Sequence, residues 1–427
     1  MTKRTTASRR ARRTPVVLAF TAVAALGLSA CGGGSTAGDT ASSGSGAAAG
    51  GEYTVWDPYP QFDDSSAWVQ LLQKCGTDNG VTVKRTGYDT TDLTNKALLA
   101  AQQGTSPDVI LIDNPVISTL ADAGALTDTE TLGLDTSGFE KNLIGAGEVD
   151  GKTYGVPVGA NTLALYYNKA VLDAAGVDPA SVTDWNSLDA ALEKVKAAGK
   201  KGITFSAIGT EEGSFQFLPW FWGSGADLKQ LDSSQGVAAL SLWKDWLDKG
   251  YAPNSVLNNT QTTSWQEFAT GDYAFSENGT WQLGNAKKTG FDWGVISIPA
   301  ESGGVAPAPT GGEFVAAPVQ SDESRYATTT KLISCLTSPD NALATDTTLS
   351  YIGATQAVQE KQSADAELKP WVEAVQGAKG RTSDNLGTDY PKISEQMWDA
   401  VQAALSGSKT PEQAMKDAQT AAASATS

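Results

Sequence analysis

The stretch Asp108-Val-Ile-Leu-Ile112 indicates the fold class, because every residue after its opening aspartate is aliphatic. A strand that is apolar at every position is typical of a parallel sheet whose two faces are both covered by helices. Working outward, strand-like runs lie at 53–56 and 81–85, and apolar residues at helical spacing follow each of them. This alternation of strands and helices predicts a doubly wound α/β layer.

A second unit of the same kind begins near residue 160. Strands are predicted at 163–167 and 202–206, and amphipathic helices follow them. A stretch rich in Gly and Pro, 299–309, marks a boundary before a last strand at 314–317. The body of the chain is therefore predicted to contain two α/β units.

The first fifty residues are predicted to be an export signal and a tether. Positions 1–13 hold six basic residues and no acidic ones, and a short apolar run follows, which is the pattern of a secretion signal. The ending Leu28-Ser-Ala-Cys31 resembles the bacterial lipoprotein box, which implies that residues 1–30 are removed and that Cys31 becomes the acylated, palmitate-bearing N-terminus. A plain signal peptide is the alternative, and both Sec and twin-arginine export stay open. Residues 31–51, mostly Gly, Ser, Ala and Thr, are predicted to form the lipid-anchored flexible linker.

The composition excludes several kinds of chemistry. The 427 residues include no histidine, which rules out a Ser-His-Asp triad, a Cys-His dyad and a His-ligated zinc ion. There are 31 basic and 48 acidic residues; because residues 1–30 hold six bases and no acids, the rest carries 25 bases and a net charge of −23. A chain this acidic is a poor partner for nucleic acid or an anionic membrane surface. We expect membrane contact only through the lipid anchor.

The three cysteines are too few for an all-cysteine metal site. Apart from Cys31, the two others are Cys75 and Cys335, and both fall on predicted helices. Outside the cytoplasm a pair of cysteines tends to be oxidised, so a disulfide between them is expected. Two buried free thiols are the alternative.

Local motifs for catalysis are weak. Gly151-Lys-Thr153 resembles the end of a phosphate-binding loop, but Ala146 stands where that loop needs glycine, and a strand follows instead of a helix. No calcium-loop spacing occurs, and no spacing singles out a pair of carboxylates for glycoside hydrolysis. We therefore expect no enzymatic activity, no cofactor and no metal.

The twelve tryptophans are more informative, although more than half of them are expected in the core. Trp56, Trp220, Trp222 and Trp281 are predicted to lie where strands end or the chain turns, among Asn, Gln and Asp side chains. Such rings can stack on the apolar face of a sugar, whose hydroxyls find planar hydrogen-bond partners nearby. Only three arginines follow residue 30, which favours a neutral ligand over an anion.

Four stretches, in their order and spacing, resemble the extracellular solute-binding proteins that serve ABC importers, in the cluster of the maltose-binding protein. The similarity spans about residues 52–424. The stretches are Ser106–Asp113 with Leu120–Leu126, Gly151–Pro157 with Leu165–Asn168, Phe268–Trp281, and Tyr390–Ala418. The resemblance implies two lobes, each a doubly wound and mainly parallel sheet, joined by a hinge of several crossings. The implied lobes are 52–158 with 314–358, and 159–313 with 359–427.

The same resemblance implies a ligand site in the cleft between the lobes, which is also where ligands of open α/β sheets bind. Asn161 departs from the maltose-binding protein, which has an acid at that crossing. Carried over residue by residue, the implied ligand contacts are Trp56, Asp57, Gln61, Asp113, Asn114, Asn161, Gln216, Trp220, Trp222, Asn278, Trp281, Gly312, Glu313, Tyr351 and Asn385.

The function that the resemblance implies is that of a monomeric substrate-binding lipoprotein on the outer face of the cell membrane. Such a protein captures a neutral mono- or oligosaccharide, closes around it at the hinge and delivers it to the ABC permease. Two alternatives stay open at this point. One is the same receptor with a cationic solute such as a polyamine, and the other is an anchored glycoside hydrolase.

Overall fold

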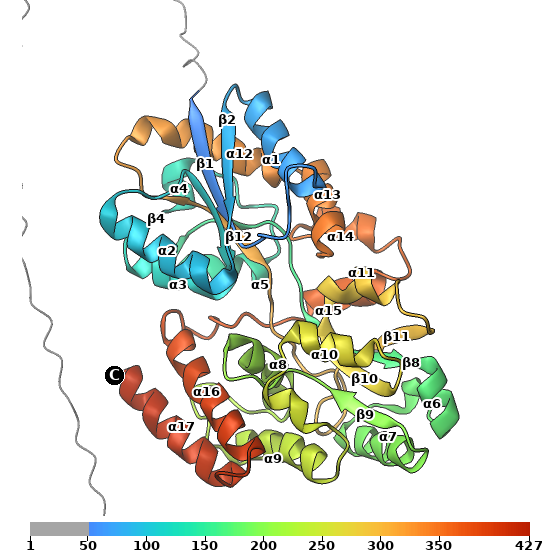
Figure 1. The fold of residues 1–427 in the computed structure, drawn as a ribbon. Helices are drawn as coiled ribbons and strands as arrows, with labels where there is room; N and C mark the ends of the chain where they lie inside the picture. The colour runs from blue at the N-terminus through green and yellow to red at the C-terminus, as the bar shows by residue number, and fades with distance from the viewer. Residues whose placement is uncertain (1–50) are drawn as a thin grey trace, which may run out of the picture. The chain divides into compact units, whose positions relative to one another are not determined.

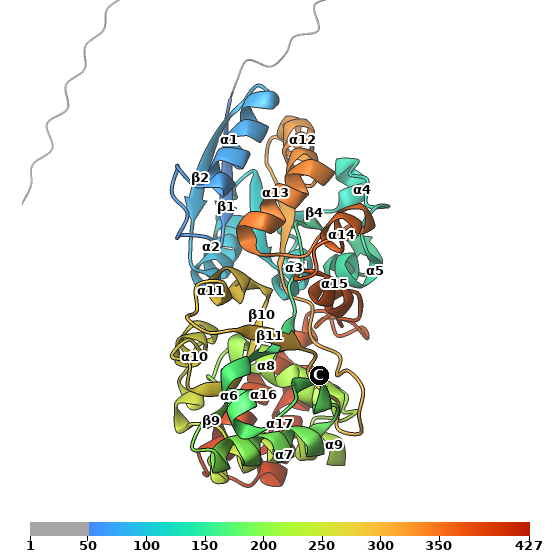
Figure 2. The same ribbon diagram turned by 90° about the vertical axis from the view of Figure 1, so that its right-hand side faces the viewer.

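The computed structural model describes residues 51–427. The predicted signal peptide, Cys31 and all but the last residue of the predicted linker lie outside the described residues. Two larger sheets organise the described chain, and helices flank both (Figure 1 and Figure 2). Within residues 51–427, no helix combines the length and the apolar character needed to cross a bilayer.

The first lobe is built on a six-stranded sheet in the order β2-β1-β3-β12-β4, with β7 also paired to β12. Its strands are β1 (Glu52–Asp57), β2 (Thr82–Gly87), β3 (Val109–Asp113), β4 (Leu126–Thr127), β7 (Val156–Pro157) and β12 (Glu313–Pro318). A separate hairpin joins β5 (Glu148–Val149) and β6 (Lys152–Thr153). The helices connected to these strands are α1 (Ala67–Asp78), α2 (Thr90–Gln103), α3 (Asn114–Asp122), α4 (Thr129–Leu132), α5 (Lys141–Ile144), α12 (Tyr326–Leu336) and α13 (Pro339–Leu349).

Strand β3 shows why this sheet is covered on both faces. Successive side chains of a strand point to opposite faces. Val109 and Leu111 pack into a core with residues of α1 and α12, whereas Ile110 and Ile112 pack into a core with residues of α2 and α3. The fully aliphatic run that predicted a doubly covered strand therefore lies at the centre of the lobe.

The second lobe is built on a four-stranded sheet in the order β11-β8-β10-β9. Its strands are β8 (Leu163–Asn168), β9 (Lys201–Thr204), β10 (Tyr273–Gly279) and β11 (Trp293–Ile296). The helices that precede β12 are α6 (Lys169–Ala175), α7 (Trp185–Ala197), α8 (Glu211–Gly223), α9 (Ser234–Asp248), α10 (Gln261–Phe268) and α11 (Leu283–Ala286). After α13 the chain forms α14 (Gln356–Gln362), α15 (Lys369–Gln376), α16 (Asp389–Leu405) and α17 (Pro411–Ala425).

Strand β8 divides the second lobe into two cores. Leu163 and Leu165 pack with residues of α7, α8, α9, α16 and α17. Ala164 and Tyr166 pack on the opposite face with residues of α10 and α15. Helices from the end of the chain thus cover a sheet formed by its middle. The exact lobe boundaries that the sequence implies stay a prediction.

The two-lobed α/β fold is confirmed, but the sheets are mixed and not mainly parallel. β1 is parallel to β2 and β3, whereas β12 is antiparallel to β3, β4 and β7. In the second sheet β10 is parallel to β9, and β8 is antiparallel to both β10 and β11. β12 is antiparallel to β3 because the chain returns from the second lobe to the first sheet at the edge where β3 ends.

The hinge consists of three crossings that pair with one another. The first crossing joins β7 to β8, and the third lies between α13 and α14. Ala160 of the first exchanges backbone hydrogen bonds of 2.7 and 2.8 Å with Ile352 of the third. Asn161 exchanges bonds of 3.1 and 2.8 Å with Gly311 of the second, which joins β11 to β12. Gly312 has φ +106°, and a Cβ there would lie 2.6 Å from the carbonyl oxygen of Gly159. This close approach needs glycine, so Gly312 serves the hinge.

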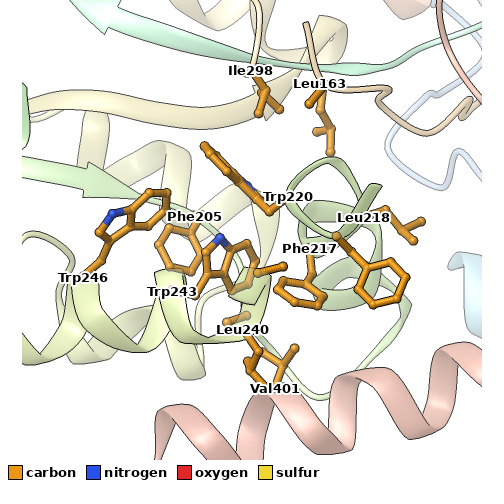
Figure 3. Close-up of a cluster of buried hydrophobic side chains, with 14 of the residues drawn as sticks. Leu163, Phe205, Phe217, Leu218, Trp220, Leu240, Trp243, Trp246, Ile298 and Val401 are labelled. Carbon is orange, nitrogen blue, oxygen red and sulfur yellow. The ribbon is translucent and has the colours of Figure 1, made fainter. Parts of the chain in front are cut away.

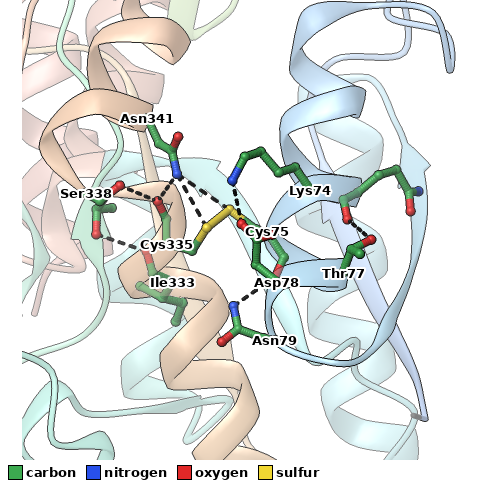
Figure 4. The surroundings of a disulfide bond; sticks show 11 residues. Lys74, Cys75, Thr77, Asp78, Asn79, Ile333, Cys335, Ser338 and Asn341 are labelled. Carbon is green, nitrogen blue, oxygen red and sulfur yellow. Dashed lines mark hydrogen bonds and ion pairs between the residues drawn. A yellow bond between two sulfur atoms is a disulfide. The ribbon is translucent and has the colours of Figure 1, made fainter.

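The predicted disulfide is present, and Figure 4 shows its surroundings. Cys75 on α1 is bonded to Cys335 on α12, with their Cα atoms 5.8 Å apart. The amide nitrogen of Asn341 donates to the Cys335 carbonyl at 2.8 Å and lies 3.4 Å from the Cys335 sulfur. The bond joins two parts of the first lobe that the whole second sheet separates in sequence.

Candidate functional site

The edge of the first sheet where β1 and β3 end carries three acidic residues. β1 ends at Asp57, and β3, parallel to it, ends at Asp113. β12 begins at the same edge with Glu313, whose Cα pairs with that of Asp113. The register thus brings Asp113 and Glu313, both predicted site residues, side by side.

Two tyrosines hold one oxygen of Glu313. Tyr59, in the loop after β1, donates its hydroxyl to Oε2 at 2.7 Å, and Tyr351, just after α13, donates to the same oxygen. Both tyrosines are buried. Burial, opposed in part by the hydrogen bond from Tyr351, raises the pKa of Glu313 to about 7.

The raised pKa of Glu313 makes the free energy of unfolding depend on pH. Because the ordinary pKa of Glu313 is 4.5, the folded protein binds the proton more tightly than the unfolded chain between about pH 4.5 and 7. The stabilisation is full at acid pH and is lost as the pH rises through 7, by at most about 3 kcal/mol. In guanidinium titrations, Glu313→Gln should therefore lose less unfolding free energy between pH 5 and pH 7.5 than the native protein. Equal losses in the two proteins would contradict the raised pKa.

A buried arginine lies against the same edge. Arg381, on the loop between α15 and α16, is 2% exposed. Its guanidinium donates to the Asp113 carboxylate at 2.8 and 3.3 Å, and Nη2 also donates to the side-chain oxygen of Asn114 at 3.1 Å. Nη1 donates to Oε1 of Glu211 at 2.8 Å. Asp113 and Asn114 belong to the first lobe and Glu211 opens helix α8 of the second, so one side chain contacts both lobes.

Aromatic side chains of the second lobe continue from this arginine. The ring of Phe215 lies 4.9 Å from the Arg381 guanidinium, and the ring of Trp281 lies 6.2 Å from that of Phe215. Trp281 lies two residues after the end of β10 and is only partly buried. Its indole folds back over Gly279, where a Cβ would lie 2.0 Å from the ring, so glycine is needed there. The second lobe thus carries a partly exposed indole that is linked to Arg381 through Phe215. Arg381 and its partners Asp113, Asn114 and Glu211 are called the arginine cluster below.

Trp56, on the first lobe, resembles Trp281 in being a partly buried tryptophan near the end of a strand. It lies next to the end of β1 and is partly buried. Its ring meets that of Tyr88 edge-on, with 5.3 Å between the ring centres. Trp56 therefore keeps an exposed portion that a ligand could contact.

The aromatic stretch 215–222 requires a correction, since it is not a turn but part of helix α8. A helix that is apolar on all sides is buried, and α8 lies within the second-lobe core. Trp220 is fully buried, donates its indole N–H to Glu277 at 2.8 Å, and lies among Phe205, Trp243 and Trp246 (Figure 3). It offers no surface to a ligand.

Two neighbours of Trp220 on α8 are also buried in the core. Gln216 is fully buried and its amide bridges the backbone of Ser206 and Glu277. Trp222 is buried as well, with the ammonium of Lys379 5.2 Å from its ring centre. Both were predicted to contact the ligand, and both instead hold the core around α8.

Asp57 is likewise used by the fold. It is fully buried, and its carboxylate accepts hydrogen bonds from Arg85 at 2.5 and 2.7 Å and from the Trp68 indole at 3.0 Å. The backbone N–H of Tyr59 donates to it at 3.0 Å. All of its acceptor capacity is directed into the first lobe, so its predicted ligand contact is not supported by this geometry.

The remaining predicted residues divide into buried and exposed ones. Asn114 and Asn278 are buried and donate to the carbonyls of Thr310 at 3.1 Å and Gln261 at 2.9 Å. Those that serve the hinge or hold Glu313 are Asn161, Gly312 and Tyr351, described above. Gln61 and Asn385 are exposed on loops. Of the predicted residues, the structure therefore places Asp113 and Asn114 on Arg381 and pairs Glu313, held by Tyr351, with Asp113. Trp281 reaches Arg381 only through Phe215, and Gln61 and Asn385 lie on the surface.

Sequence reasoning missed Tyr59, Glu211 and Arg381. The one signal for Arg381 in the sequence is that arginine is scarce after residue 30. The structure shows that each of the three arginines there pairs with an aspartate on β1 or at an end of β3. Scarcity by itself argues against an anionic ligand and does not show which carboxylates an arginine contacts. Nothing in the local sequence marks Tyr59 or Glu211.

A separate pocket of about 450 Å³ lies in the second lobe, between the edge strand β11 and α15. Its walls include Pro179, Val295, Val305 and Trp371, and none of the predicted site residues lines it. The lining carries no charged side chain, and Thr183 and Ser297 are its hydroxyl-bearing residues, so its side chains offer few hydrogen-bond partners to a polar solute. The arginine cluster is the better candidate site.

Comparison with protein families gives one match that covers most of the chain. The model of the family described as bacterial extracellular solute-binding protein matches residues 70–374. A binding protein of Brucella abortus is 27% identical over 173 residues, which is 38% of this chain. The match spans only 41% of that relative's length.

Two further comparisons extend over more of the chain. The maltooligosaccharide ABC transporter solute-binding lipoprotein of Streptococcus pneumoniae is 27% identical over 314 residues, covering 70% of this chain and 71% of the relative. The GacH receptor of Streptomyces glaucescens, whose structures include a complex with acarbose, superposes with a TM-score of 0.74 at 25% identity. That superposition covers 87% of this chain and 97% of the receptor.

Proposed function

The chain belongs to the bacterial extracellular solute-binding proteins, and we propose that it captures a neutral mono- or oligosaccharide between its two lobes for an ABC importer. Hinge closure would then bury the sugar and present the closed protein to the permease. The Streptococcus pneumoniae relative is named for maltooligosaccharides and the GacH receptor was solved with acarbose, which supports an oligosaccharide as the ligand class.

One observation carries the proposal for this chain itself. The partly exposed indole of Trp281 lies beside Phe215, and Phe215 packs against the Arg381 guanidinium. That guanidinium pairs with Asp113 and Glu211. A pyranose ring has an apolar face that stacks on an indole and hydroxyls that need acceptors and donors at its rim. Asp113 and Glu313 supply such acceptors, and the hydroxyls of Tyr59 and Tyr351 hold Glu313 in place by donating to it.

The proposed cellular setting follows from the family and the N-terminal sequence. Members of this family are extracytoplasmic transport proteins and not enzymes, and we propose the same absence of catalysis here. We further propose that Cys31 carries the lipid anchor to the outer face of the cell membrane and that the protein works as a monomer. The name of the Streptococcus pneumoniae relative, a lipoprotein, supports the anchor.

Isothermal titration calorimetry against a panel of neutral mono- and oligosaccharides tests the proposed ligand class. We expect one sugar per protein and an affinity nearly independent of salt, because a neutral ligand is not screened. Spermidine is the cationic control, and its binding, if it occurs, should weaken steeply with salt. If spermidine gives binding heat and none of the sugars does, the protein is a cation receptor. If a sugar is cleaved during the titration, the protein is a hydrolase.

A further inference from the structure

The position of Arg381 differs from that of the other arginines in residues 51–427. Arg85 pairs with Asp57, and Arg325 pairs with Asp108. In both of these pairs the two partners belong to the first lobe. Arg381 alone among them pairs with carboxylates of both lobes.

Surrounding contacts fix this arginine. Backbone hydrogen bonds of 2.9 Å join Lys379 to Ala308 and Thr310, so the loop that bears Arg381 is tied to the second hinge crossing. On the other side, the hydroxyl of Tyr390 donates to the Glu211 carboxylate at 2.6 Å. The arginine is almost fully buried, unlike the exposed ion pairs that contribute little.

We propose that Arg381 is a positioning residue that couples the two lobes at the sugar site. Because its guanidinium pairs with both Asp113 and Glu211, it holds the two lobes in a relative arrangement in which one sugar can contact both. This inference rests on the proposed function, since it concerns the same site. Without the link, the sugar itself would have to order the lobes, and its apparent affinity would fall with the population of the ordered state.

Small-angle X-ray scattering of the sugar-free full chain tests the link without any ligand. Arg381→Met should increase the radius of gyration, and Arg381→Lys, which keeps the charge but loses the planar fork, should give an intermediate value. Arg325→Met is the matched control, because it removes an ion pair with Asp108 inside one lobe. It should lower the melting temperature and leave the radius of gyration unchanged. A native radius of gyration for Arg381→Met would overturn the proposal.

Calorimetric titration with maltotriose adds a second readout. Arg381→Met and Glu211→Ala should each weaken maltotriose binding by about tenfold, as expected when one tenth of the protein remains in the ordered state. Glu212→Ala is the control within the same helical turn, because Glu212 instead accepts the backbone N–H of Gln261 at 2.8 Å. Native affinity in Glu211→Ala would also overturn the link between the lobes.

The two readouts separate the failure of this inference from that of the proposed function. If the native chain does not bind maltotriose, that sugar is ruled out as its ligand. The scattering experiment then still tests the positioning role of Arg381. If maltotriose binds equally well to native protein and Arg381→Met, the receptor role stands and the positioning role falls.

Discussion

Replacing both cysteines of the Cys75–Cys335 bond with alanine is expected to lower the free energy of unfolding by about 2–5 kcal/mol. The bond closes a loop across a sequence separation of 260 residues, and the entropy that a cross-link removes from the unfolded chain grows with loop length. It also joins α1 to α12, which cover one face of the first sheet. Chemical denaturation of the native and double-variant proteins measures the difference.

Reduction of the native protein provides the control for this prediction. The reduced native chain should unfold at nearly the same denaturant concentration as the Cys75→Ala/Cys335→Ala variant. A reduced native protein as stable as the oxidised one would contradict the structural role of the bond.

Trp281→Ala is expected to weaken sugar binding by roughly 30-fold, equivalent to about 2 kcal/mol, which is a typical loss for a tryptophan at the centre of a binding site. The reason is geometric: the ring is partly exposed, lies two residues after the end of β10 and packs on Phe215, which contacts Arg381. Titration of the variant with the tightest-binding sugar of the panel measures the effect.

Trp293→Ala is the matched control for Trp281. Trp293 is also partly buried, but it lies on the edge strand β11, with its ring 5.8 Å from that of Tyr166. Its removal should lower stability through lost packing and leave sugar affinity near the native value. If both variants bind alike, Trp281 has no special role in the site.

Much of the fold could be predicted because its signals are local. The aliphatic run in β3 and the apolar spacing of α1 and α2 follow directly from strand and helix periodicity. The direction of β12 could not be predicted this way, because it depends on where a chain returning from the second lobe meets the first sheet. A strand has the same alternation of side chains in either direction.

The candidate site was predictable only where it lies at the ends of strands. Asp113 and Glu313 follow from that position, and Trp281 from the end of β10. The α8 aromatics were misinterpreted because a helix buried on all sides shows no amphipathic period, so Trp220 resembled a residue of a turn. Arg381 and Glu211 are 170 residues apart, and only the packing of α8 and α16 brings them together.

The most direct test of the sugar-receptor function is an X-ray structure of the full chain with the sugar that binds most tightly in the calorimetric panel. We predict sugar density between the lobes, with one ring stacked on Trp281 and a hydroxyl within hydrogen-bond distance of Asp113 or Glu313. Density confined to the apolar pocket between β11 and α15, with Trp281 uncovered, would contradict the proposed site.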